Sequence, residues 1–272
     1  MIRFTKAHAC GNDFLIVDEA DAKGDHAQIA RYLCERNTGV GADGVEFLER
    51  KADGELSLRL FNADGSEAEL SGNGTRCVAA WLAYSERIQQ VVLGTHGGPR
   101  SCRVLQQDDD EFLIATEMGV PVVTPHSVDV EGVGVVQGAD VNVGNPHFVI
   151  FTEDAEFRSY GLGWQELGAK ICVHPAFPHG TNVEFVRVIS PVEIAFRIYE
   201  RGVGPTTSSG TGTCASAAAS IALRGCAHEL EATSLGGAQQ VMWQGGDAVM
   251  HLTGPARVIC VGEAGVAGAA KL

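Results

Sequence analysis

The chain contains the stretch SGNGTRC at residues 71–77 and repeats it as SGTGTC at residues 209–214, 138 positions later in a chain of 272. The flanks repeat as well, because Asn62 and Glu200 each lie nine residues before the serine and each end a run typical of a strand. A segment rich in small residues follows both copies and predicts a helix. Two units of related design, each with one strand–loop–helix element, are therefore expected.

Alternating and β-branched runs occur along the whole chain and outnumber the helical patterns. We expect strands at 14–17, 56–61, 91–93, 112–115, 148–151, 183–188 and 192–198, and helices at 27–36, 75–85 and 213–224. Few of these elements alternate in strict β–α–β order, so mostly antiparallel sheet packed on helices is favoured over a Rossmann-type parallel sheet. The predicted fold class is α+β.

The composition excludes several classes of partner. The formal net charge is -14 and the pI is near 5.0, which argues against nucleic acid because that partner needs a basic surface. No apolar stretch approaches a membrane span and the first residues lack the apolar run of a signal peptide, so we expect no membrane partner and a cytoplasmic protein. The eight cysteines form no CxxC pair, so zinc has no signature, and each cysteine is expected to be a small buried side chain.

The repeated motif indicates a site for an anion. A glycine-rich turn that opens a helix presents backbone N–H groups and the positive end of the helix dipole at one point, which suits a phosphate or a carboxylate. One copy alone also fits a simple tight turn. Two copies facing one cleft would hold a carboxylate and place Ser71 and Ser209 on opposite sides of the adjacent carbon. That is the geometry of a two-base 1,1-proton transfer.

Polar residues beside Gly or Pro form four further candidate clusters. They are Asn12 in AHACGNDF, Asn62 in FNADGSEAEL, Asn145 and His147 in VGNPHFVIF, and Asn182 in HGTNVEF together with Glu200 and Arg201 at the RGVG loop. Asparagine beside glycine commonly serves a turn, and His147 also fits a hydrogen-bonded turn residue. Arg201 is the stronger candidate, because a loop arginine in an acidic chain can bind a carboxylate with two hydrogen bonds.

Taken together, these motifs resemble the diaminopimelate epimerase family along nearly the whole chain. The matching segments are KAHACGNDFLIVD at 6–18, RNTGVGADG at 36–44, FNADGSEAELSGNGTRC at 61–77, GNPH at 144–147, TNVEF at 181–185 and ERGVGPTTSSGTGTCASAA at 200–218. The resemblance implies two pseudo-symmetric lobes, 1–117 with 258–272 and 118–257, each a mostly antiparallel barrel-like sheet around a central helix, with the active site in the cleft between them.

The resemblance also implies an activity. It is the epimerisation of an amino acid, L,L- and meso-diaminopimelate in lysine and peptidoglycan precursor biosynthesis, by a homodimer without pyridoxal phosphate, metal or other cofactor. The positions that match the family's substrate-binding residues are Asn12, Asn62, Asn145, Asn182, Glu200 and Arg201, with the backbone at Gly72, Asn73, Gly210 and Thr211 holding the reacting carboxylate and His147 near the reacting carbon.

The chain departs from the family pattern at the reacting groups. Ser71 and Ser209 stand where the family has cysteine, and Pro205 stands where it usually has an acidic residue. Cys77 and Cys214 cannot replace the missing thiols, because they lie roughly 8–9 Å further along the helix. A thiol has a pKa of about 8.5 and an unassisted hydroxyl one of about 15.7, so forming the alkoxide costs roughly 9–10 kcal/mol more.

Three explanations of the serines are open at this point. The residues are engineered to stop turnover, or they are natural and serve a different reaction or an added base such as His147 or His8, or the protein binds an amino acid without catalysis. The alternative to diaminopimelate epimerisation is therefore an isomerase, racemase or dehydratase of the same fold, or a binding protein.

Overall fold

The computed structural model describes residues 1–265 and divides into two compact units. The N-terminal unit consists of Met1–Thr116 and the segment that starts at Gly254, and the C-terminal unit consists of Glu117–Thr253. The sequence prediction placed the two boundaries after residues 117 and 257. Both units combine a mostly antiparallel sheet with a central helix, which confirms the α+β class.

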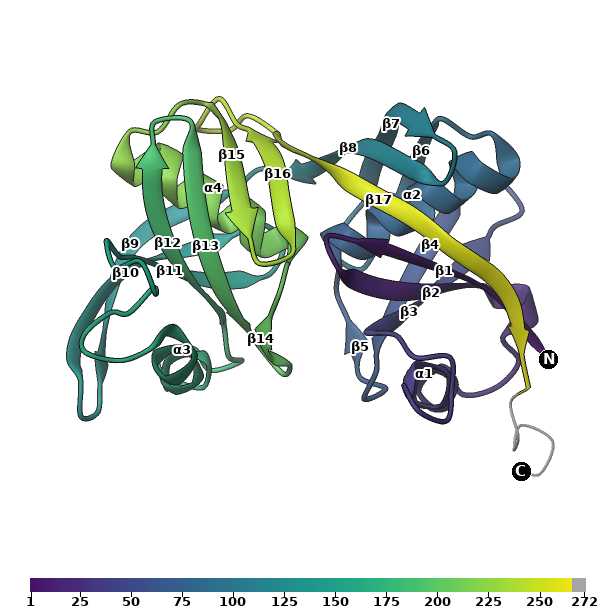
Figure 1. The fold of residues 1–272 in the computed structure, drawn as a ribbon, viewed down its shortest axis with the longest axis horizontal. Coiled ribbons are helices and arrows are strands. Elements are labelled where there is room, and N and C mark those ends of the chain that lie inside the picture. Colours follow the sequence, from purple (N-terminus) through teal and green to yellow (C-terminus); the bar gives the residue numbers. More distant parts are fainter. Residues whose placement is uncertain (266–272) are drawn as a thin grey trace. The chain divides into compact units, whose positions relative to one another are not determined.

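Eight strands of the N-terminal unit close into a barrel. They are β1 (Ile2–Ala9), β2 (Asn12–Asp18), β3 (Gly44–Arg50), β4 (Leu56–Asn62), β6 (Gln90–Gly94), β7 (Arg100–Asp108), β8 (Glu111–Gly119) and β17 (Met250–Ala264), paired in this order, and β17 pairs again with β1. The β2–β3 and β4–β6 pairs are parallel. All eight strands contribute side chains to one core around α2 (Gly72–Glu86), which runs through the barrel (Figure 1).

The remaining elements of the N-terminal unit are short or lie outside the barrel. Helix α1 (His26–Cys34) packs on the outer face of β3 and β4, and a second apolar core fills the space under it. A 3₁₀ turn, η1 (Glu19–Asp21), precedes α1, and the two-residue strand β5 (Glu67–Ala68) pairs with β4.

The C-terminal unit repeats this plan. Its strands pair in the order β9 (Val122–Val130), β10 (Gly134–Asn142), β11 (Pro146–Phe151), β12 (Asn182–Ser190), β13 (Glu193–Glu200), β15 (Glu229–Ser234), β16 (Gly237–Met242) and the start of β17. They surround α4 (Gly210–Arg224), while α3 (Trp164–Cys172) packs outside and β14 (Gly204–Thr206) pairs with β13 (Figure 1). The β11–β12 and β13–β15 pairs are parallel, as β2–β3 and β4–β6 are in the other unit.

Both central helices begin earlier than the sequence suggested, at Gly72 and Gly210 and not at residues 75 and 213. The side chains of Ser71 and Ser209 are N-caps, which makes the glycine-rich segment the first helical turn. A Cβ on Gly74 would lie 1.9 Å from Oε1 of Glu46, so a larger residue at this place of the turn would force the Glu46 side chain to move. The glycine at position 74 is therefore accounted for by the close approach of the Glu46 side chain from β3. A need for a flexible turn does not account for it.

Seven of the eight cysteines are buried as expected, but the expectation is wrong for Cys260, which is exposed on β17. The pairing of β17 with β1 shifts register between Lys6 and Ala7, so that Lys6 lies opposite Cys260 and Ala7 opposite Val258. The bulge breaks the alternation of buried and exposed positions. Among the helices of residues 1–265, none has the length and apolar character needed to cross a membrane.

Candidate active site

The cap and first turn of α2 bring together four of the site residues predicted in the N-terminal unit. The Ser71 side chain caps the helix and accepts a hydrogen bond from the Gly74 N–H at 3.0 Å. Asn73 is fully buried, and its Nδ2 donates to Oδ1 of Asn12, at the start of β2, at 3.2 Å. The N–H groups of Gly72 and Asn73 belong to the positive end of the helix dipole, where an anion is stabilised.

A charged network that the sequence reasoning missed holds Asn12 in place. Nδ2 of Asn12 donates to Asp43 Oδ2 at 2.7 Å, and Arg36 Nη2 bridges Asp43 and Asp13 at 2.7 and 3.0 Å. Lys6 Nζ lies 3.0 Å from Asp13. Burial opposes ionisation of Asp13, but the hydrogen bonds from Arg36 and Lys6 outweigh it and lower the pKa of that carboxyl. The aspartates follow glycines in GND and GAD, within segments that carried the family resemblance.

Asn62 lies at the same end of the sheet as Asn12 but in a different local role. Asn62 on β4 lies opposite Gly44 on β3, and Gly44 lies opposite Phe14 on β2. Asn12 is two residues before Phe14 on the same strand. Nδ2 of Asn62 donates to Ser66 Oγ at 3.0 Å, which holds the turn that leads into β5.

The C-terminal unit joins five side chains into one hydrogen-bonded chain that starts at the cap of α4. Ser209 Oγ accepts from the Gly212 N–H at 3.2 Å and lies 3.4 Å from Thr211 Oγ1. Asn145 Nδ2 donates to Thr211 Oγ1 at 3.4 Å, and Asn145 Oδ1 lies 2.9 Å from His147 Nε2. Nδ1 of His147 ends the chain at Oε1 of Glu184, 2.6 Å away.

His147 and Glu184 form a buried hydrogen-bonded pair. Both side chains are fully buried. Asn145 donates to Thr211 through its amide nitrogen, so its oxygen is left to accept from His147 Nε2. On the other side of the ring, Nδ1 is hydrogen-bonded to Glu184 Oε1. Burial raises the pKa of Glu184, and the interaction with His147 opposes the rise. His147 therefore reaches Ser209 through Asn145 and Thr211, without touching it.

Asn182, Glu200 and Arg201 surround the turn after β13. Asn182 Oδ1 accepts from the backbone N–H of Arg201 at 2.9 Å, and its Nδ2 donates to Pro146 O at 3.0 Å. Thr206 Oγ1 donates to Glu200 Oε1. The Arg201 guanidinium donates to His179 O at 3.0 Å and remains half-buried, so the arginine proposed as a carboxylate clamp is bound to a backbone carbonyl in this structure.

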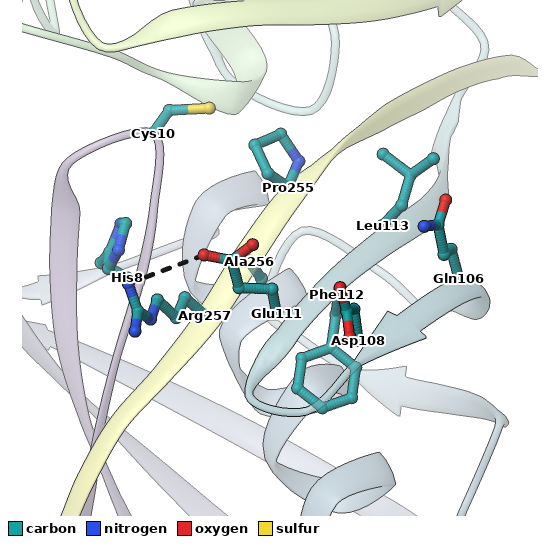
Figure 2. Close-up of a pocket in the computed structure, with 10 residues that line it drawn as sticks. All are labelled: His8, Cys10, Gln106, Asp108, Glu111, Phe112, Leu113, Pro255, Ala256 and Arg257. Carbon is teal, nitrogen blue, oxygen red and sulfur yellow. Dashed lines mark ion pairs between the residues drawn. The ribbon is translucent and has the colours of Figure 1, made fainter.

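The other groups considered as bases are two cysteines and His8. Cys77 and Cys214 are completely buried in the cores of the two units, and burial raises the pKa of Cys77. His8 accepts from the Gly11 N–H at 3.4 Å and lines a cavity of about 430 Å³ between β1, β7, β8 and β17. Figure 2 shows this cavity, where Arg257 pairs with Glu111 at 3.6 Å.

An anionic ligand can be bound by the backbone N–H groups in the first turn of a helix. These groups belong to Gly72 and Asn73 on α2, and to Gly210 and Thr211 on α4. In residues 1–265, no group of three or more His, Cys, Asp and Glu side chains is arranged to hold a metal ion.

Comparison with known proteins agrees with this architecture. A family model described as diaminopimelate epimerase matches residues 4–124 and 140–259. The chain belongs to the diaminopimelate epimerase family. A diaminopimelate epimerase of Desulforudis audaxviator is 37% identical over 282 residues, covering 96% of this chain and 99% of the relative. Another, of Prochlorococcus marinus, is 36% identical and covers 95% of this chain and 91% of the relative. The chain is accordingly an isomerase of the epimerase and racemase type.

Solved structures show the same fold at low identity. A hydroxyproline epimerase of Agrobacterium vitis superposes with a TM-score of 0.73 at 18% identity, covering 96% of this chain and 91% of that one. A probable proline racemase of Agrobacterium radiobacter gives a TM-score of 0.75 at 17% identity, covering 98% and 94%. At this identity the likeness establishes the fold alone, which confirms the fold expected of this family member.

Proposed function

We propose that this member of the diaminopimelate epimerase family interconverts L,L- and meso-diaminopimelate by removing the α-proton and returning it on the other face. The relatives at 33–37% identity that carry this name cover 95–96% of the chain, which supports the substrate. The repeated first turn supports the reaction, because each unit supplies one serine at a helix N-terminus.

In this proposal the backbone N–H groups of Gly72 and Asn73, and of Gly210 and Thr211, bind the reacting carboxylate. Negative charge moves onto that carboxylate when the α-proton leaves, and helix N-termini stabilise such charge. Asn12, Asn62, Asn145, Asn182, Glu200 and Arg201 bind the rest of the substrate. The single observation that carries the proposal is that Ser71 and Ser209 have the same capping geometry, 3.0 and 3.2 Å from the N–H of a glycine three residues on.

The serines set a limit on the rate. Each hydroxyl receives an N–H at a helix N-terminus, and such a position stabilises a negative charge by about 0.3–2 kcal/mol. That is small beside the roughly 9–10 kcal/mol that separates alkoxide from thiolate formation. We therefore propose that the reaction is slower than with cysteines, and that His147 acts on Ser209 as a positioning residue through Asn145 and Thr211.

Conversion of L,L-diaminopimelate to the meso form, followed by chiral chromatography, tests the proposal. The chain should produce meso-diaminopimelate, Ser71→Ala and Ser209→Ala should each abolish it, and Ser85→Ala on the exposed end of α2 should not. The double variant Ser71→Cys, Ser209→Cys should convert faster. If neither the chain nor the double cysteine variant forms the meso compound, the proposed function is wrong.

Because a serine hydroxyl ionises far less readily than a cysteine thiol, two alternative functions are open for a protein of this fold. It acts on another compound, or it binds an amino acid without converting it. Calorimetry separates these outcomes from the first. Binding of diaminopimelate without conversion identifies a binding protein. No binding, together with conversion of another amino acid, identifies a different isomerase.

We also propose that the protein is a cytoplasmic homodimer. All eight cysteines are free thiols, which supports a reducing compartment. Cell fractionation tests the location, and sedimentation velocity tests the dimer. A periplasmic protein or a monomer would contradict the respective part.

A further inference from the structure

Each central helix starts over a buried glutamate. Glu46 on β3 and Glu184 on β12 are 138 residues apart, the same separation as Ser71 and Ser209. The parallel partner strand places Ile16 opposite Glu46 and Val149 opposite Glu184. Both glutamates therefore hold equivalent places in the two units, on the face of the sheet that packs on the central helix.

The carboxyl and the serine flank one glycine in each unit. A Cβ added to Gly74 would lie 1.9 Å from Glu46 Oε1 and 3.2 Å from Ser71 Cβ. A Cβ added to Gly212 would lie 3.1 Å from Glu184 Oε1 and 3.2 Å from Ser209 Cβ. In each unit the carboxyl and the serine side chain therefore lie on either side of one glycine at the start of the helix. For the Glu46 carboxyl to meet the Ser71 hydroxyl, its side chain has to change rotamer.

The two glutamates differ in their partner. His147 lies opposite Asn182 in the strand register and is hydrogen-bonded to Glu184, whereas the equivalent residue of the N-terminal unit, opposite Gly44, is Phe14. Phe14 thus holds the place in the N-terminal unit that His147 holds in the C-terminal unit.

Burying the Glu46 carboxyl group at this position costs folding free energy. It is 2% exposed, and desolvation alone raises its pKa to about 8. The ionisable side chains on the part of α2 that packs on this layer are Arg76 and Cys77. The neighbours on the same face of the barrel, Leu48, Leu58 and Leu60, are apolar. A leucine would fill the place without the cost of burying a carboxyl, so a chemical use accounts for the glutamate better than packing does.

We propose that Glu46 is the proton-exchanging partner of Ser71, an inference that rests on the proposed function. It deepens that function by supplying the base that a serine lacks. Glu46 acts through Ser71 and does not touch the substrate.

The step is a proton relay. The Cα–H bond of the substrate breaks as its proton forms a bond to Ser71 Oγ, and the proton of the Ser71 hydroxyl moves to the ionised Glu46 carboxyl. The electron pair stays on the α-carbon and its carboxylate, and Ser209 delivers its hydroxyl proton to the other face. Glu46 then releases a proton to water and Ser209 regains one, so nothing is oxidised or reduced. In the reverse direction Glu46 returns its proton as Ser71 protonates the α-carbon.

The experiment compares Glu46→Gln with Glu49→Gln, a matched change at an exposed position of the same strand. Because general acid–base partners contribute about 10²–10⁴-fold, kcat for conversion of L,L-diaminopimelate should fall by at least about 100-fold in Glu46→Gln, with little change in KM. The rise of the wild-type rate as Glu46 ionises should disappear from the pH profile, and Glu49→Gln should match the wild type. Circular dichroism checks that both variants fold.

A second measurement does not depend on turnover. The Glu46 carboxyl, labelled with carbon-13, is titrated by NMR in the wild type and in Ser71→Ala, and its pKa should shift when the hydroxyl is removed. An unchanged titration, or a Glu46→Gln variant with the wild-type rate and pH profile, overturns the inference and leaves the proposed function standing. Failure of the wild type and of the double cysteine variant to convert diaminopimelate overturns the proposed function instead.

Discussion

Nδ1 of His147 lies 2.6 Å from Oε1 of Glu184, and neither side chain is exposed to solvent. The pair ends the hydrogen-bonded chain that begins at the cap of α4. The same place in the N-terminal unit holds Phe14 and Glu46. The two units therefore share a backbone plan but differ in the side chain that accompanies the buried glutamate.

Replacing His147 by Phe copies the N-terminal unit and leaves Glu184 buried without its partner. Breaking a buried pair in this way costs about 3–5 kcal/mol of unfolding free energy. The cost should be larger at pH 9 than at pH 5, because protonation removes the charge on Glu184. Urea unfolding measures it. Adding Glu184→Gln should recover most of the loss, and an equal loss in the double variant would show that the histidine matters only for packing.

Glu46→Gln should make the stability of the protein less dependent on pH. The pKa of Glu46 is raised from 4.5 to about 8 in the folded protein, so the folded state binds more protons than the unfolded state between these values. The unfolding free energy of the wild type therefore falls as pH rises through this range.

One pKa unit corresponds to about 1.36 kcal/mol. The unfolding free energy of Glu46→Gln, measured relative to that of the wild type, should therefore increase by about 4 kcal/mol from pH 5 to pH 9. Denaturant unfolding at both pH values checks this, with Glu49→Gln as the control. A constant difference between Glu46→Gln and the wild type would show that Glu46 is not a lone buried acid.

Gly74→Ala should destabilise the protein although alanine favours helices. The new methyl group would lie 1.9 Å from Glu46 Oε1, and overpacking of this kind costs about 1–3 kcal/mol, more than the roughly 1 kcal/mol that a helix gains from the change. Thermal unfolding measures the loss. In a Glu46→Ala background the loss should largely vanish, because the methyl group then enters the space of the carboxyl. The same loss in both backgrounds would refute the contact.

Ser71→Cys and Ser209→Cys should raise activity and lower stability together. The thiols ionise near neutral pH, so the conversion rate should rise at least about tenfold in the double variant, which is a barrier change of 1.36 kcal/mol. Each serine is the N-cap of its helix, and losing such a cap costs about 0.5–2 kcal/mol. Enzyme assays and denaturant unfolding on the same preparations check both. A double variant slower than the wild type would mean that the serines are the bases this site requires.

The sequence repeat predicted the two related units, and the strand and helix patterns placed β2, β4, β11, β12, β13, α1 and α4 within a few residues of their observed bounds. Periodicity did not locate α3 or β3, and it also missed β1, β5, β7, β9, β10 and β14 to β17. In β3 the sequence GVEFLER alternates weakly, because both of its faces are covered, one by α1 and one by α2.

The sequence motifs predicted only some of the residues of the candidate site. The serine caps and the asparagines lie in glycine-rich motifs that a sequence displays. Glu46 and Glu184 lie inside apolar strands, where a glutamate looks like an outward-facing residue until the strand is placed under a helix. The chain from Ser209 to Glu184 joins residues from three separate segments, so no local pattern could reveal it.

Proton NMR of L,L-diaminopimelate in heavy water tests whether two hydroxyl groups exchange the α-proton with solvent. The α-proton signal should decay as meso product forms, the new α-position should carry deuterium, and Ser71→Ala should stop the decay. Meso product that retains its original proton, or undiminished exchange in Ser71→Ala, would contradict the proposed exchange.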